Sequence, residues 1–213
     1  MSLVSWDREA IMKTVTDVTR TRKWREVIRH LRDVTDGNGM PIDPGILETC
    51  VILNLLDFRT EMSCEGHLDH GLPYPWVRII SVDAEASYEQ ATACTKRSGI
   101  LGQEPASYEE AVQQQALLDE AGMWREQAWH ALACEGSRLF AYLHQFYETH
   151  PTSQDRQLVL ITDVSLGYLQ IASQGGPLLL AMPAGSRAPL FSAYQQEMQA
   201  FTAFLVDCYR QMA

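Results

Sequence analysis

The sequence predicts an α+β protein in which a mostly antiparallel sheet of about five strands packs with several helices, one of them long and central. Long stretches carry apolar residues at three-and-four spacing, as amphipathic helices do. Short runs rich in β-branched residues alternate with glycine-containing turns, as antiparallel strands do. Because 213 residues suffice for one substantial core, a single domain over 1–213 is expected. Its predicted segments are 1–40, 41–83, 84–150 and 158–213.

The N-terminal segment is predicted to be helical from about residue 5 to residue 34. Its second half places Trp24, Ile28 and Leu31 on one apolar face. Six basic residues lie around that face: Arg20, Arg22, Lys23, Arg25, Arg29 and Arg32. This basic side of the helix is either solvated or an anion site, and the sequence leaves its role open.

The second segment is predicted to form a helix, a strand, a loop and another strand. Asp43 followed by Pro44 is a typical helix start, with Asp as the N-cap and Pro at the first helical position. The helix is expected to end near Asp57. Residues 58–63 and 76–82 then predict two strands, with the chemically densest loop of the chain between them.

The third segment is predicted to hold two helices. Ser87 and Ser107 each begin a Ser-Tyr-Glu-Gln or Ser-Tyr-Glu-Glu pattern, in which the serine and the residue three positions later cap a helix. Each serine should therefore open a helix. The second helix should run over residues 108–149, with a break near Gly122 or Gly136.

The last segment is predicted to begin with a three-stranded meander. Three short β-rich runs, 158–164, 168–172 and 178–182, are separated by glycine-containing turns. Residues 190–211 then show apolar residues at helical spacing, which predicts a C-terminal helix packed across the sheet.

Composition limits the classes of partner. Lys and Arg number 17 against 27 Asp and Glu, a formal charge of −10, which disfavours broad binding to nucleic acid or anionic membranes. No apolar run reaches the roughly 20 residues that cross a bilayer. The five cysteines are scattered and form no C-x-x-C pair, which argues against a disulfide framework. We expect a cytoplasmic protein whose cysteines are mostly reduced and buried.

Residues 63–76, SCEGHLDHGLPYPW, form the candidate site. A thiol, carboxylates and imidazoles follow a predicted strand and precede glycine and proline, as in a loop that presents reactive groups from a rigid scaffold. The candidate catalytic residues are Cys64, Glu65 and His67. The candidate ligand-binding residues are Asp69, His70, Tyr74 and Trp76.

Several chemistries suit this loop. Cys64, His67 and His70 form a C-x2-H-x2-H series that could bring three ligands to one divalent metal, with zinc as the first candidate cofactor. Alternatively, Cys64 is a thiolate nucleophile activated by His67 or by backbone N–H groups. In a third reading, Glu65 and His67 work as acid and base beside an apolar wall. The remaining alternative is a structural loop in which Cys64 is an inert buried thiol.

Residues 60–67, TEMSCEGH, followed by GLPYPWV at 71–77, resemble a family of uncharacterised bacterial proteins with an SCEGH loop after a helix and a strand. More distantly, the Ser-Cys-x-Gly pattern is similar to the Ser-Cys-Ser-Gly-Arg loop of the wybutosine-synthesis tRNA methyltransferase family. That likeness would imply S-adenosylmethionine and tRNA. Because His67 stands where that family has Arg and Glu65 replaces a serine, we carry over no activity.

Two classes of function follow from these observations. In the first, the loop forms a small-molecule or catalytic pocket, with or without the assistance of a metal. In the second, the protein is a non-catalytic binding or homo-oligomerisation module, in which the long helix and the C-terminal helix bury a partner surface and the loop is structural.

Overall fold

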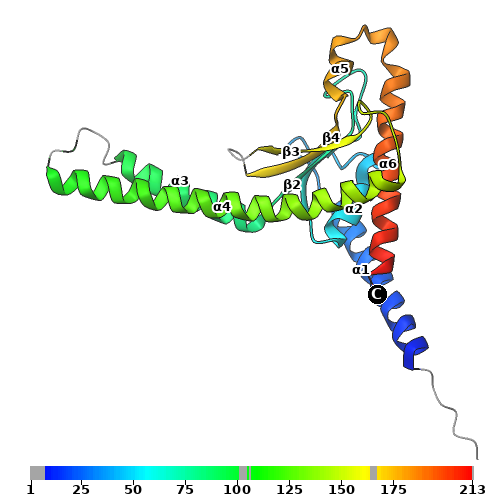
Figure 1. Ribbon diagram of the computed structural model, residues 1–213, viewed down its shortest axis with the longest axis horizontal. Coiled ribbons are helices and arrows are strands. Elements are labelled where there is room, and N and C mark those ends of the chain that lie inside the picture. Colours follow the sequence, from blue (N-terminus) through cyan, green and yellow to red (C-terminus); the bar gives the residue numbers. More distant parts are fainter. Residues whose placement is uncertain (1–7, 101–104, 106, 164–166, 213) are drawn as a thin grey trace, which may run out of the picture.

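A computed structural model describes residues 8–100, 105, 107–163 and 167–212, with residues 8–18 and 100 described by their backbone alone. It is an α+β structure, as predicted, with a four-stranded antiparallel sheet and one long helix (Figure 1). The elements in chain order are α1 (Arg8–Arg32), α2 (Pro44–Leu55), β1 (Arg59–Cys64), β2 (Trp76–Ile80), α3 (Val82–Ile100), α4 (Tyr108–Thr149), β3 (Leu158–Asp163), β4 (Tyr168–Ser173), α5 (Gly176–Ala181), a 3-10 turn (Ala184–Ser186) and α6 (Ala188–Gln211).

The sheet has the order β1-β2-β4-β3, and every neighbouring pair is antiparallel. Side chains alternate between its two faces, as the pleat requires. Val77 and Ile79 of β2 and Leu169 and Ile171 of β4 are fully buried on the core face. The register places Cys64, the last residue of β1, opposite Trp76, the first residue of β2. This pairing fixes both ends of the loop that carries the candidate site.

The prediction of about five strands was wrong by one strand. Residues 178–182 belong to α5 and the residue that ends it, not to a third strand of a meander. A short apolar run does not distinguish a strand from a helical turn by itself. Pro177 decides the outcome here, because proline is well suited to the first turn of a helix and cannot donate to a sheet. Only Leu179 of the Leu178–Leu179–Leu180 run is buried.

The core lies between the sheet and the helices α2, α4 and α6. Almost every apolar side chain of α2 is buried, because α1, α6 and β1 all pack against this helix. α6 adds Tyr194, Met198, Phe201 and Leu205, which repeat at helical spacing and are at most 1% exposed. Because it is packed on several sides, α2 is a rigid support for the residues at its N-terminus.

Helix α4 is continuous, so the predicted break near Gly122 or Gly136 was wrong. Gly136 faces the sheet: a Cβ atom there would lie 3.5 Å from Leu169 Cδ2, so the missing side chain lets α4 run close to β4. Gly122 faces open space. Gly136 therefore allows close packing against the sheet, Gly122 is tolerated in the helix, and α4 has no kink at either residue.

Helix α3 begins earlier than predicted. The hydroxyl of Ser81 accepts a hydrogen bond from the Ala84 N–H (3.4 Å), and Ser87 lies inside the helix. The second predicted cap is confirmed, because the Ser107 hydroxyl accepts from the Glu110 N–H (3.2 Å). α3 and the first half of α4 pack against each other as a helical hairpin that extends away from the sheet, to the left in Figure 1. We call this hairpin, residues 82–100 and 108–127, the arm.

None of the helices in the described ranges is both long enough and apolar enough to cross a membrane.

Candidate functional site

The loop between β1 and β2 folds back tightly on itself. The His67 N–H donates to the Leu72 carbonyl (3.2 Å), and Gly66 and Gly71 adopt positive φ angles of 86° and 62°. A Cβ atom on Gly66 would lie 2.8 Å from the Tyr74 carbonyl carbon, so only glycine fits at this crossing. The two chain ends of the loop are thereby held against each other.

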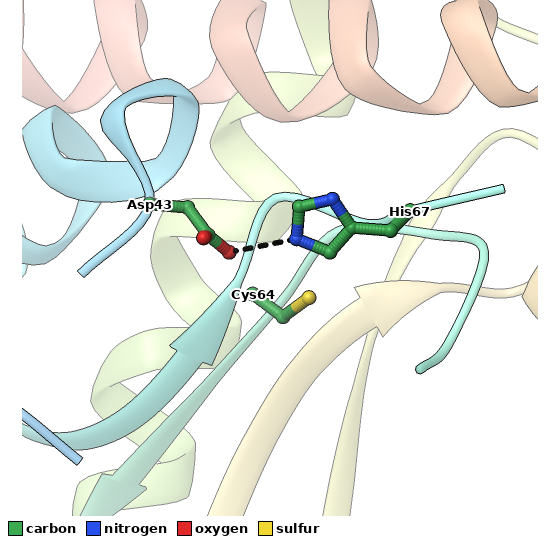
Figure 2. Close-up of side chains that lie close together, drawn as sticks. All are labelled: Asp43, Cys64 and His67. Carbon is green, nitrogen blue, oxygen red and sulfur yellow. Dashed lines mark hydrogen bonds and ion pairs between the residues drawn. The ribbon is translucent and has the colours of Figure 1, made fainter. Parts of the chain in front are cut away.

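The loop brings Cys64 and His67 to Asp43, the residue that precedes α2 (Figure 2). One ligand atom from each of the three side chains lies within 4.8 Å of the others. His67 Nε2 is 3.3 Å from Asp43 Oδ2, and these two side chains are 23% and 29% exposed. The Cys64 sulfur accepts a hydrogen bond from the Gly66 N–H (3.3 Å). A thiol, an imidazole and a carboxylate therefore meet in a half-buried position.

Contacts of Asp43 and Glu65 hold the three side chains of this cluster in place. Asp43 stands at the N-cap of α2, but its side chain makes no cap hydrogen bond to the helix. Its carboxylate instead accepts from the Glu65 N–H (3.1 Å), and the Glu65 carboxylate accepts from the Gly45 N–H in the first turn of α2 (2.6 Å). Glu65 thus satisfies a free N–H of the helix and releases Asp43 to face His67.

Glu65 was a candidate catalytic residue, and the structure gives its carboxylate a capping contact. A Cβ atom on Gly45 would lie 2.5 Å from Glu65 Oε2, so glycine at this position makes the close approach feasible. The Gln195 side chain of α6 donates to the Glu65 carbonyl (3.1 Å). Glu65 is therefore tied to α2 and α6 at once, which suits a residue that positions the loop.

His70 was a candidate ligand beside Cys64 and His67, and it lies in a second cluster. Its Nδ1 is 2.8 Å from Asp69 Oδ1, and its ring stacks on His67 with centroids 4.1 Å apart. His67, Asp69 and His70 also bring ligand atoms within 4.8 Å of one another, but Asp69 and His70 are 86% and 67% exposed. The hydrogen bond from His70 lowers the pKa of Asp69. His67 is shared by both clusters, whereas Cys64 groups with Asp43.

The surroundings of Cys64 favour the neutral thiol. Burial raises the pKa of Cys64, the Gly66 N–H opposes this, and the negative charge of Asp43 and Glu65 adds to it. A thiolate nucleophile of the kind considered from the sequence gains no support from these groups. A divalent cation between Cys64 and Asp43 would reverse the balance, because a coordinating thiol is deprotonated by the metal.

Tyr74 and Trp76 were expected from the sequence to form an apolar wall beside the loop, and the structure shows their contacts with other elements. Tyr74 packs on α5: a Cβ atom on Gly176 would lie 2.6 Å from the ring. Trp76 neighbours Cys64 across the strands, and the Arg78 guanidinium lies 5.9 Å from its ring centroid. Three cavities lie away from this loop. One is between α3, β1 and α4, one is beside α3, and one is between α2 and α6. Cys64, Glu65 and His67 line none of these three.

Asp43 is the site residue that the sequence did not identify. Its Asp-Pro-Gly context predicts only a helix cap. It gives no indication that the Asp43 carboxylate contacts His67. The sequence feature that could have pointed to Asp43 is Glu65, a second carboxylate able to cap the first turn of α2 from the loop.

Searches of protein-family models, curated proteins and solved structures found no match to this chain. The two resemblances of the SCEGH loop therefore stay predictions.

Proposed function

We propose that this protein binds a divalent transition metal, zinc in the first place, through Asp43, Cys64 and His67, and that the metal centre binds and activates a small molecule. The observation that supports the proposal is the convergence of three different ligand types, from the start of α2 and from two points of the loop, within 4.8 Å. None of these residues is adjacent in the chain to another. A site assembled across two segments is typical of metal centres.

The donor set suits zinc. Thiolate sulfur, imidazole nitrogen and carboxylate oxygen are the three ligand types of protein zinc sites, with bonds of about 2.0–2.3 Å. The 3.3 Å separation of His67 and Asp43 would give way to two bonds to the same ion. Three protein ligands leave one tetrahedral position for water or substrate, and zinc lowers the pKa of such a water to about 7.

This chain's own residues would orient the ligands. The Glu65 N–H holds one oxygen of Asp43, and Gln195 holds the Glu65 carbonyl from α6. Such contacts around the ligands are what keep a metal site in a reactive geometry. In the proposed centre His70, whose ring centroid lies 4.1 Å from that of His67, would contact a molecule at the open position. The function supported best is thus metal-assisted hydrolytic or lyase chemistry on a small molecule.

Zinc affinity is expected to rise with pH. The Cys64 thiol has a raised pKa and is protonated at pH 7, so metal binding must release its proton. Below the thiol pKa, one released proton gives about tenfold tighter binding per pH unit. Competition titration against a chromophoric chelator between pH 6 and pH 8 measures this slope. A slope that is the same in wild type and in Cys64→Ser would exclude Cys64 as a ligand.

Self-association is a second candidate function, favoured by charge. The exposed side of α1 carries Arg22, Arg25, Arg29 and Arg32 in one row. Residues 20–32 hold six basic and one acidic residue, whereas the two helices of the arm hold eight acidic and three basic residues. The arm also exposes apolar side chains, with Val112 and Met123 each more than half exposed. The basic row of one copy and the arm of a second copy are therefore complementary.

Reversing charges in the basic row should weaken this association. Arg25→Glu with Arg29→Glu is expected to raise the dimer dissociation constant at least about tenfold, because both side chains would then repel the acidic arm. Sedimentation equilibrium at low and high salt measures it, with Arg156→Glu as the matched reversal in a distant loop. A monomer at every concentration, or a dimer indifferent to salt and to the double reversal, would rule out this second function.

A further inference from the structure

A cavity of about 530 Å3 lies away from the Cys64 loop, between α4, the start of α3 and the first residue of β1. Its volume is in the range of small-molecule sites. The α4 side of the cavity carries His130, Cys134 and Glu135. A nucleophilic side chain and a base are thus adjacent in a cavity that the metal proposal does not use.

Cys134 differs from the other cysteines. It is exposed, whereas Cys50 and Cys94 are buried and Cys64 and Cys208 are half-buried. The expectation that most of the five cysteines are buried is therefore wrong, because only two of them are. Its sulfur lies 3.7 Å from Nδ1 of His130, one helical turn earlier. With the ring proton on Nε2, the thiol donates to Nδ1, so His130 is positioned to take the thiol proton.

The walls of this cavity carry charges of both signs. Arg59 and Arg138 contribute the positive charges. Arg138 is held in place by donating to the Leu56 carbonyl (3.1 Å), whereas Arg59 is 57% exposed and lies 3.7 Å from the Glu85 carboxylate. The negative charges are Asp57, Asp83 and Glu135. A ligand with both an ammonium and a carboxylate group would be complementary to such a surface.

We infer that this cavity is a second, thiol-based site, in which Cys134 forms a mixed disulfide with a small zwitterionic disulfide of the amino-acid type. His130 takes the Cys134 proton, and the thiolate attacks one sulfur of the bound disulfide. A new S–S bond forms to Cys134 while the S–S bond of the ligand breaks. The leaving thiolate takes the proton from His130. Cys134 is oxidised to the mixed disulfide, half of the ligand is reduced to a thiol, and no other oxidant is needed.

The sequence holds a signal for this site. His130 and Cys134 are four residues apart on a helix, which places them on the same face. That spacing matches no metal or catalytic motif by itself. The exposure of both side chains and the charges that β1 and α3 bring to the cavity become visible only in the structure.

The test uses the full reduced protein and cystine as the probe, with intact-mass and peptide mass spectrometry. Bis(2-hydroxyethyl) disulfide is the uncharged comparison, and each rate is divided by the rate for the same protein unfolded in urea. The adduct is expected on Cys134, with a folded-to-unfolded rate ratio at least about fivefold higher for cystine than for the uncharged disulfide. Cys134→Ser should abolish the adduct, and Cys208→Ser should not.

His130→Gln separates activation from mere exposure. It should slow the reaction about tenfold at pH 7 and move the midpoint of the pH–rate profile to higher pH, because the thiol loses its proton acceptor. His144→Gln is the matched control on the same helix, since His144 is exposed and its contacts are with Glu148 and Phe140 of that helix. An adduct at another cysteine, equal rate ratios for the two disulfides, or an unchanged pH profile in His130→Gln would overturn the inference.

Discussion

Replacing Cys64 by serine is expected to weaken zinc binding at least about 100-fold. The substitution removes one of only three protein ligands and exchanges a thiolate for a hydroxyl, which binds zinc poorly at neutral pH. His67→Ala should have an effect of the same size, because His67 is half-buried beside Cys64 and Asp43. Competition titration with a chromophoric chelator measures the affinity of each variant.

Two matched variants show whether the loss belongs to the proposed centre. Cys208→Ser removes another half-buried thiol, on α6, and should leave the affinity within about threefold of wild type. His70→Ala should also have a small effect, because His70 bonds to Asp69 and is largely exposed. If His70→Ala abolished binding and Asp43→Ala did not, the metal would lie in the exposed second cluster.

Replacing Gly66 by alanine is expected to lower the free energy of unfolding by about 2–4 kcal/mol. Two penalties combine at this position. The φ angle of 86° is unfavourable for any residue with a Cβ atom, and the new methyl group would meet the Tyr74 backbone at 2.8 Å. Relief requires the loop to move, so the variant should also lose metal affinity. Urea unfolding followed by circular dichroism measures the stability.

Gly71 provides the control for Gly66, since the two residues share one penalty and differ in the other. Gly71 has a φ angle of 62°, and a Cβ atom there would meet nothing within 4 Å. Gly71→Ala should therefore cost only about 1 kcal/mol and leave metal binding intact. Equal stability losses in the two variants would show that the contact with Tyr74 does not constrain the loop.

Much of the fold could be predicted because its signals are local. Asp43–Pro44 marks the start of α2, and Ser107 marks the start of α4, because caps depend on residues one to three positions away. The prediction of a fifth strand was wrong because a run of leucines fits a helical turn as well as a strand. The predicted break in α4 was wrong because Gly136 is explained by close packing against Leu169, a residue distant in the chain.

The candidate site could be predicted only in part. Cys64 and His67 stand out in the sequence because they are three residues apart in one loop. Asp43 belongs to them only because the Glu65 carboxylate caps α2 in its place, a contact across 20 residues. Spacing alone groups His70 with Cys64, whereas in the structure its side chain contacts Asp69. Spacing predicts which residues are near in the chain, whereas the folded structure decides which side chains meet.

Cobalt titration of the wild-type protein, followed by absorption spectroscopy, tests the metal centre most directly. Co2+ occupies zinc sites of this donor set and reports both the coordinating thiolate and the coordination number in its spectrum. The proposal predicts one Co2+ per chain, a thiolate-to-cobalt charge-transfer band, d–d bands of a four-coordinate ion, and displacement by Zn2+. Saturable binding without a thiolate band, an unchanged spectrum in Cys64→Ser, or no binding at all would contradict a metal centre at Asp43, Cys64 and His67.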